Sequence, residues 1–184
     1  MNYKNISAVC LAALFATACS KNNESDKAAE TTAVVDSSKA VADKKMADAE
    51  KGKLPKPYNA DEDASARIEM LIAQARKEDK KIILQAGGNW CIWCLRFNNF
   101  IQTTPELKSI VDQNYLYYHL NYSPENKNEE VFSRYGNPGE KYGYPVFIVL
   151  DSSGKLIHTQ DSAVLEEEKG YSKEKVIAFL EKWR

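Results

Sequence analysis

The chain has 184 residues, of which 43% are hydrophobic, and its formal net charge is −1. This length and apolar content suffice for one domain with a hydrophobic core, but they are too small for two domains of ordinary size. The near-neutral charge and the lack of a dense cluster of lysine and arginine in the sequence exclude nucleic acid as an expected partner.

Residues 1–18 have the pattern of a signal peptide. Lys4 supplies a positive start, and the apolar stretch that follows is too short to span a bilayer. The stretch ends in Ala-Thr-Ala before Cys19 and resembles the lipobox of bacterial lipoproteins, with Ala16 in place of the usual leucine. An ordinary Ala-x-Ala cleavage site is the alternative, and both interpretations cut before Cys19. We expect an exported protein in which Cys19 carries a lipid.

Residues 19–57 are predicted to form a flexible, lipid-anchored linker. The segment is rich in Lys, Asp, Glu, Ser, Thr and Ala, and it has no aromatic residue between Phe15 and Tyr58. Such a composition buries too little apolar surface to offset the entropy lost on ordering. A transient helix over residues 39–51 is the alternative for part of this segment. The folded domain is then expected over residues 58–184.

The first half of this domain predicts a helix, a strand and two further helices. Apolar residues recur at helical spacing over residues 61–78, which predicts an extra amphipathic helix at the N-terminal side. A continuous apolar run within residues 81–86 predicts a strand buried on both faces. Two glycines and an asparagine end this strand, and a helix is expected from Trp90 or Cys91 to about residue 102. Thr104, Pro105 and an acidic residue predict the start of another helix.

The second half predicts three strands and two helices. Residues 115–121 form an aromatic strand pattern, and residues 128–135 are consistent with a short helix. A strand over residues 145–150 is followed by turn residues and by an antiparallel partner over residues 155–160. Ser172 is expected to cap a final amphipathic helix. The order predicts the α/β class, with a mixed central sheet flanked by helices on both faces.

The spacing of two cysteines is the main chemical feature. Cys10 leaves with the signal peptide and Cys19 is expected to be lipidated, so Cys91 and Cys94 are the thiols left to the domain. At a helix start, free backbone N–H groups and the helix dipole stabilise a thiolate at the first cysteine. The second cysteine lies one turn further on the same face, where it can close a disulfide. The pair therefore indicates thiol-disulfide exchange.

A zinc half-site is the rival interpretation of the same spacing. A closed zinc site needs two further ligands, and the chain offers only His119 and His158, with no second cysteine pair. We therefore predict neither a metal nor an organic cofactor.

Two motifs in this order resemble the thioredoxin-like superfamily. One is Trp-Cys-Ile-Trp-Cys over residues 90–94, after a strand and glycines, and the other is Gly-Tyr-Pro-Val-Phe over residues 143–147, before a hairpin. The similarity covers about residues 61–184 and is greatest to bacterial envelope proteins with a Trp-Cys-x-x-Cys motif. It implies a thioredoxin-like fold. It also implies an attacking Cys91 and a resolving Cys94.

The resemblance also implies a substrate-binding surface around the cysteines. Trp90 matches the aromatic flank of the motif, and Pro145 matches the cis-proline that faces the disulfide. Tyr144 matches the residue whose backbone pairs with an incoming peptide. Together with Trp93, the aromatic side chains of Trp90 and Tyr144 are expected to form an apolar rim.

The sequence departs from the thioredoxin pattern at two positions. Gln85 stands where thioredoxins usually place a buried aspartate, and His119 stands where they place a lysine in the following strand. We hypothesise that His119, titrating near pH 6.5, or water relayed by Gln85, carries the proton of Cys94. The alternative is a strand histidine that faces solvent or packs under a helix.

The resemblance implies a thiol-disulfide oxidoreductase, and we predict that it reduces protein disulfides. Neither residue between the cysteines is a histidine of the kind that stabilises the reduced form of strong oxidants. The expected partners are disulfide-containing proteins, a membrane thiol that donates electrons, and the membrane itself through the lipid. We expect a monomer in the bacterial cell envelope that faces the periplasm. The alternatives are an isomerase or oxidase, and a protein that holds copper or a client without turnover.

Overall fold

The computed structural model describes residues 26–184, and side chains from residue 39 onward. The predicted signal peptide and Cys19 lie outside the described residues. The chain divides into two units, residues 1–42 and 43–184. None of the helices in the described part is long and apolar enough to cross a membrane.

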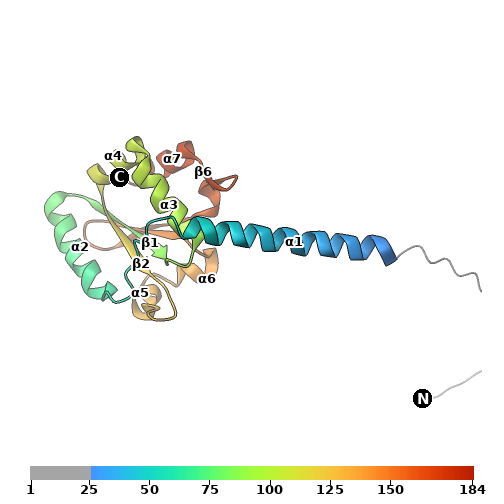
Figure 1. Cartoon of the computed structure of the whole chain (residues 1–184). Coiled ribbons are helices and arrows are strands. Elements are labelled where there is room, and N and C mark those ends of the chain that lie inside the picture. Colours follow the sequence, from blue (N-terminus) through green and yellow to red (C-terminus); the bar gives the residue numbers. More distant parts are fainter. Residues whose placement is uncertain (1–25) are drawn as a thin grey trace, which may run out of the picture. The chain divides into compact units, whose positions relative to one another are not determined.

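The domain contains a four-stranded mixed sheet with the order β2-β1-β3-β4 (Figure 1). The strands are β1 (Lys81–Gly87), β2 (Tyr115–Asn121), β3 (Val146–Leu150) and β4 (Leu156–Asp161). β1 is parallel to β2 and antiparallel to β3, and β3 is antiparallel to β4. All five residues of β3 and all but the first of β1 are buried. The predicted thioredoxin-like α/β fold with a mixed sheet is therefore confirmed.

Helices cover both faces of this sheet (Figure 1). On one face, α2 (Ala64–Glu78) and α5 (Glu129–Arg134) pack against alternate residues of β1, β2 and β3. On the other face lie α3 (Ile92–Thr103), α4 (Pro105–Asn114) and α7 (Lys173–Trp183). The two hydrophobic layers follow from the period-2 alternation of side chains in the strands.

Several local predictions need adjustment. Ser172 and Thr104 occupy the N-cap positions of α7 and α4, but neither side chain makes a capping hydrogen bond. The residues from Pro138 form a short helix that the sequence analysis does not include, α6 (Pro138–Tyr142). A small hairpin of β5 (Glu166–Glu167) and β6 (Gly170–Tyr171) is likewise absent from the sequence analysis. It follows the 3-10 turn η1 (Ala163–Leu165).

The predicted linker contains the helix α1 (Asp26–Lys51), which includes the alternative helix expected over residues 39–51. Alanine, lysine and glutamate are good helix formers, so the local composition favours a helix even though the segment has little apolar surface to bury. The compact unit also begins at Asp43 rather than at residue 58. Within this unit, Glu50 accepts two hydrogen bonds from Arg96 of α3, at 2.8 Å from Nε and 2.6 Å from Nη2. The last turns of α1 are thereby attached to the domain.

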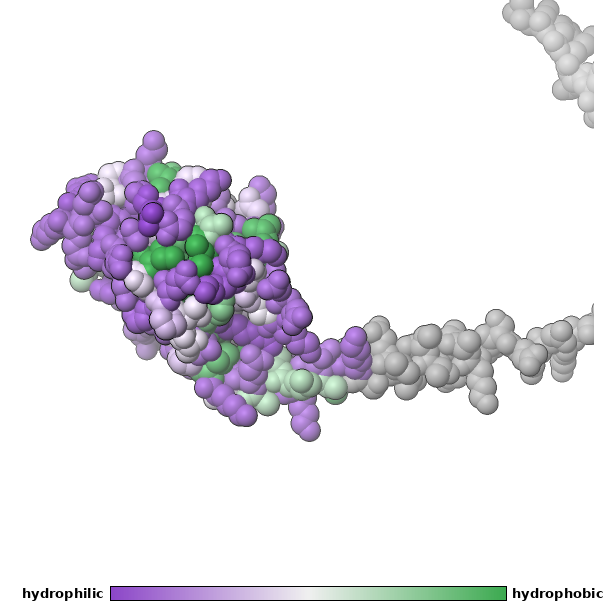
Figure 2. All heavy atoms as spheres, turned by 90° about the horizontal axis from the view of Figure 1, so that it is seen from above, coloured by the Kyte–Doolittle hydropathy of each residue, from purple (hydrophilic) through white to green (hydrophobic). Residues whose placement is uncertain are grey.

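The visible face of the domain in Figure 2 is mostly hydrophilic, with hydrophobic side chains in small separate patches. The large hydrophobic side chains exposed among the described residues are Val41, Met46, Met70, Trp90, Leu156 and Val164. Trp90 is the member of this group that lies beside the cysteines.

The contact between Glu50 and Arg96 gives the first prediction. We expect Glu50→Gln to accelerate hydrogen exchange of the backbone amides of residues 43–51, because the fork of Arg96 loses its charged partner. The free energy of unfolding should fall by less than about 1 kcal/mol, since Glu50 is partly exposed to solvent. Exchange followed by mass spectrometry measures the first quantity, and urea denaturation measures the second.

Asp48→Asn is the matched control, because Asp48 pairs with Lys51 of the same helix. It should leave the exchange rates at the α1 end close to those of the parent. Equal rates in the parent and in Glu50→Gln would show that the ion pair does not attach α1.

Candidate active site around the Cys91–Cys94 disulfide

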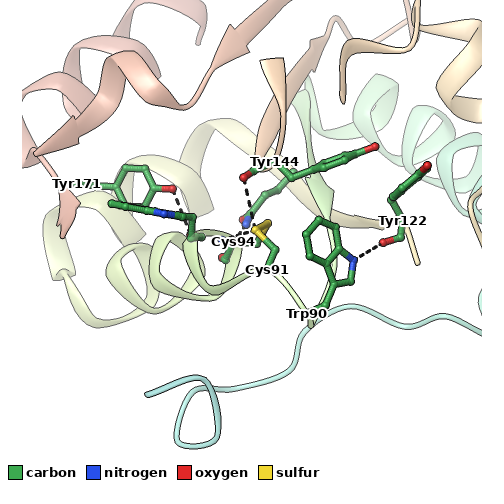
Figure 3. The surroundings of a disulfide bond; sticks show 8 residues. Trp90, Cys91, Cys94, Tyr122, Tyr144 and Tyr171 are labelled. Atoms are coloured by element: carbon green, nitrogen blue, oxygen red, sulfur yellow. Dashed lines mark hydrogen bonds between the residues drawn. A yellow bond between two sulfur atoms is a disulfide. The ribbon is translucent and has the colours of Figure 1, made fainter. Parts of the chain in front are cut away.

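Cys91 and Cys94 form a disulfide at the N-terminus of α3, with their Cα atoms 5.2 Å apart (Figure 3). Cys91 is the N-cap residue, and its Sγ accepts a hydrogen bond from the backbone N–H of Cys94 at 3.1 Å. Partial positive charge at this helix end favours a thiolate on Cys91 when the disulfide opens. Cys91 is 6% exposed and Cys94 is 0% exposed. The first sulfur is therefore the one that a substrate can reach.

The loop before β3 faces the disulfide. The Tyr144–Pro145 peptide bond is cis, in agreement with the resemblance. The carbonyl oxygen of Tyr144 lies 3.5 Å from Cys91 Sγ (Figure 3). An oxidised sulfur carries no proton, so this carbonyl remains available to accept a hydrogen bond from another group.

Aromatic side chains form a wall on one side of Cys91. Trp90 is 47% exposed, and its indole Nε1 donates a hydrogen bond to the carbonyl of Tyr122 at 2.7 Å (Figure 3). The ring of Tyr144 packs edge-on against Trp90 at 5.7 Å and stacks on Tyr122 at 5.1 Å between ring centroids. A groove next to this wall is lined by Ala60, Trp90, Tyr122 and Pro124. Trp90 and Tyr144 therefore meet as predicted, and Tyr122 is a member that the sequence did not single out.

Trp93 lies on the other side of the cysteines, against a different set of residues. Its ring packs edge-on against Tyr171 at 5.8 Å, and the Tyr171 hydroxyl donates to the Trp93 carbonyl at 3.2 Å. The guanidinium of Arg96 lies 4.9 Å from the Trp93 ring centroid, within the range of a cation–π contact. Trp93 and Tyr144 both pack against the cluster of Tyr58, Cys91 and Cys94, and Trp93 lies on the side of this cluster where Tyr171 and Arg96 contact it.

Gln85 is a positioning residue behind the disulfide. It is fully buried in β1, and its Nε2 donates to the backbone carbonyl of Cys94 at 2.9 Å. Its Oε1 accepts a hydrogen bond from the hydroxyl of Tyr117 at 2.7 Å. Both ends of the amide are therefore occupied by partners other than sulfur. Gln85 therefore holds the first turn of α3 in place. That a water bound to Gln85 carries the proton of Cys94 stays a prediction.

His119 lies beside Gln85 in the paired strand β2, between the rings of Tyr58 and Tyr117. Its Nε2 is buried without a hydrogen-bond partner among the residues that the structure describes, and burial lowers the pKa of His119 to about 4. This corrects the expected titration near pH 6.5, because desolvation disfavours the charged imidazolium. The packed histidine was the alternative that the sequence left open.

No group of three or more His, Cys, Asp and Glu side chains suited to a metal comes together within the described part of the chain.

Comparisons with known proteins agree with the fold. A family model described as thioredoxin-like matches residues 63–152. The solved disulphide isomerase from Xylella fastidiosa Temecula1 is 22% identical with a TM-score of 0.62, and the match covers 70% of this chain and 97% of that chain. This level of identity establishes a shared fold.

Two other solved structures are similar at lower scores. The oxidised DsbD C-terminal domain of Neisseria meningitidis is 22% identical with a TM-score of 0.48, covering 66% of this chain and 97% of that domain. A DsbH oxidoreductase is 18% identical with a TM-score of 0.46, covering 69% of this chain and 88% of its own. A search of curated proteins finds no significant match to this chain.

The lowered pKa of His119 gives the second prediction. The folded state favours the neutral imidazole of His119. The contribution of this imidazole to the free energy of unfolding is therefore fully present above pH 6.5 and is lost as the pH falls toward 4. We expect the free energy of unfolding of the parent to fall by about 1–3 kcal/mol more than that of His119→Gln between these values. Urea denaturation at a series of pH values measures the difference.

An NMR titration of the His119 ring is the direct check. A midpoint near 6.5, or parallel pH dependence of stability in the parent and in His119→Gln, would contradict this assignment.

Proposed function

We propose that this chain, whose fold is thioredoxin-like, is a thiol-disulfide oxidoreductase that reduces protein disulfides through Cys91 and Cys94. The observation that carries the proposal is the place of Cys91 at the start of α3, where the N–H of Cys94 reaches its sulfur. The same backbone donor would stabilise the Cys91 thiolate in the reduced protein.

The reaction follows from the exposure of the two sulfurs. The Cys91 thiolate attacks one sulfur of a substrate disulfide and displaces the other as a thiolate, which leaves a mixed disulfide on Cys91. Cys94 then attacks Cys91 Sγ, releases the second substrate sulfur and closes the Cys91–Cys94 disulfide. The substrate gains two electrons and the protein dithiol loses two. A dithiol donor must restore the reduced pair, and a membrane thiol carrier fits this role.

The surroundings of Cys91 suit an extended polypeptide substrate. The Tyr144 carbonyl would accept a backbone N–H of the substrate, because it lies next to the reacting sulfur. Trp90 would cover apolar side chains, since nearly half of its surface is exposed beside the groove. Trp93 contributes less directly, because Tyr171 and Arg96 pack against it.

The direction and the location of the reaction are also proposals. The apolar pair Ile92-Trp93 offers no cation to stabilise the reduced form, which favours a reducing potential. The sequence of residues 1–19 supports export and a lipid on Cys19, in the envelope and facing the periplasm. Isomerisation is the second candidate, because the Xylella protein that shares the fold is a disulphide isomerase.

The third prediction concerns the two cysteines. Reduction of insulin in the presence of dithiothreitol should fall to the rate of dithiothreitol alone in Cys91→Ser, because the attacking sulfur is gone. Cys94→Ser should also lose turnover and should accumulate mixed disulfides that survive non-reducing electrophoresis, because the resolving step is blocked.

Cys19→Ser is the matched control, and it should retain the full rate in purified protein. Full activity of Cys91→Ser would refute the catalytic assignment. If the protein accelerates the refolding of scrambled ribonuclease over the uncatalysed rate but does not accelerate insulin reduction over dithiothreitol alone, the isomerase is favoured instead.

A further inference from the structure

Tyr58 is a buried residue of the segment before α2 and packs directly against the two cysteines. It forms a small cluster with Cys91 and Cys94 and is only 4% exposed. Its hydroxyl is shielded from water and makes no hydrogen bond of good geometry to any described residue, although the side chain of Gln85 lies close to it. Leaving a buried hydroxyl unpaired is unfavourable, so a buried group of this kind calls for a functional explanation.

The position of Tyr58 is fixed by the active-site loop itself. The backbone N–H of Tyr58 donates to Asn89 Oδ1 at 3.2 Å, and Asn89 Nδ2 donates back to the Tyr58 carbonyl at 2.8 Å. Asn89 precedes Cys91 by two residues. The tyrosine is therefore tied to the same loop that presents the cysteines.

Gly87, at the end of β1, opens the space that the hydroxyl and the sulfur share. A Cβ atom at this position would collide with Cys94 Sγ and would lie 3.1 Å from the Tyr58 oxygen. Cys94 Sγ and the Tyr58 hydroxyl oxygen therefore both lie next to Gly87, which has no side chain to separate them. A hydroxyl that can rotate there needs only a small movement to point its hydrogen at the sulfur.

The surroundings keep Tyr58 in its protonated form. Burial raises the pKa of Tyr58 well above its usual value of 10, and the ionisable side chains around it are Tyr117, His119 and Tyr171. The hydroxyl is thus a donor at physiological pH. The Cys91–Cys94 disulfide offers it no charged acceptor, whereas a thiolate at Cys94 does.

We propose that Tyr58 is a catalytic residue that donates a hydrogen bond to the Cys94 thiolate when the disulfide is open. This inference rests on the proposed function. In the resolving step the stabilised Cys94 thiolate attacks Cys91 Sγ, the Cys91–substrate bond breaks, and the substrate sulfur leaves as a thiolate. The proton that Cys94 lost passes through water to this leaving sulfur. The hydroxyl of Tyr58 keeps its own proton throughout.

The fourth prediction tests this role with Tyr58→Phe, which removes only the oxygen. In a Cys91→Ser background, with cysteine Cβ atoms labelled with ¹³C, NMR titration reports the pKa of Cys94 directly. We expect Tyr58→Phe to raise this pKa by about one, the shift expected for the loss of a hydrogen bond to a charged group. In the chain with both cysteines, the release of glutathione from a mixed disulfide on Cys91 should slow by about threefold near neutral pH, because a tenfold smaller thiolate fraction is partly offset by the greater nucleophilicity of the more basic thiolate.

Tyr118→Phe is the matched control, because Tyr118 is a buried tyrosine in the hydrophobic layer on the opposite face of the sheet. It should change neither quantity. Tyr58→Phe should keep the thermal stability of the parent, since the lost oxygen has no partner in the oxidised protein. An unchanged Cys94 pKa in folded Tyr58→Phe would overturn the inference. Failure of the proposed function would appear separately, as a parent protein that cannot reduce insulin.

Discussion

The hydrogen bonds of the Gln85 side chain join the central strand to the helix that carries the cysteines. An amide is tolerated at this fully buried place because Cys94 accepts from one end and Tyr117 donates to the other. The first turn of α3 is thereby held over the end of β1. The position of Cys91 relative to the Tyr144 carbonyl and the burial of Cys94 both depend on this attachment. The conformation of the reactive loop is thus set from inside the core.

Much of the fold could be predicted from local patterns. The apolar run in β1, the turn after β3 and the amphipathic spacing in α2 are each short-range signals, and each element forms close to where it was expected. The cysteine spacing and the residues around Pro145 likewise identified the sulfurs and the facing loop. The helices and strands follow from the period of side chains along the chain, which a single sequence displays directly, whereas the facing loop at Pro145 follows from the resemblance to the thioredoxin-like superfamily.

The parts that escaped prediction depend on contacts between distant segments. Tyr58 reaches the cysteines only because Asn89 binds its backbone, and nothing near Tyr58 in the sequence marks that contact. The pKa of His119 is set by the aromatic rings that bury it, so its value could not be obtained from residue type alone. The sequence does contain a signal for Tyr117, because residues two apart in a strand share a face and Tyr117 lies two residues before the candidate His119. The α1 contact was hidden because Arg96 and Glu50 are far apart in the chain.

The unequal exposure of the two sulfurs bears on the regiochemistry of any covalent adduct with this domain. Since Cys94 is completely enclosed and Cys91 is slightly open, bulky thiols and electrophiles will meet one sulfur only. Every macromolecular conjugate should therefore carry its bond on Cys91 Sγ. Only one of the two cysteines, Cys91, is therefore expected to form covalent bonds with other molecules.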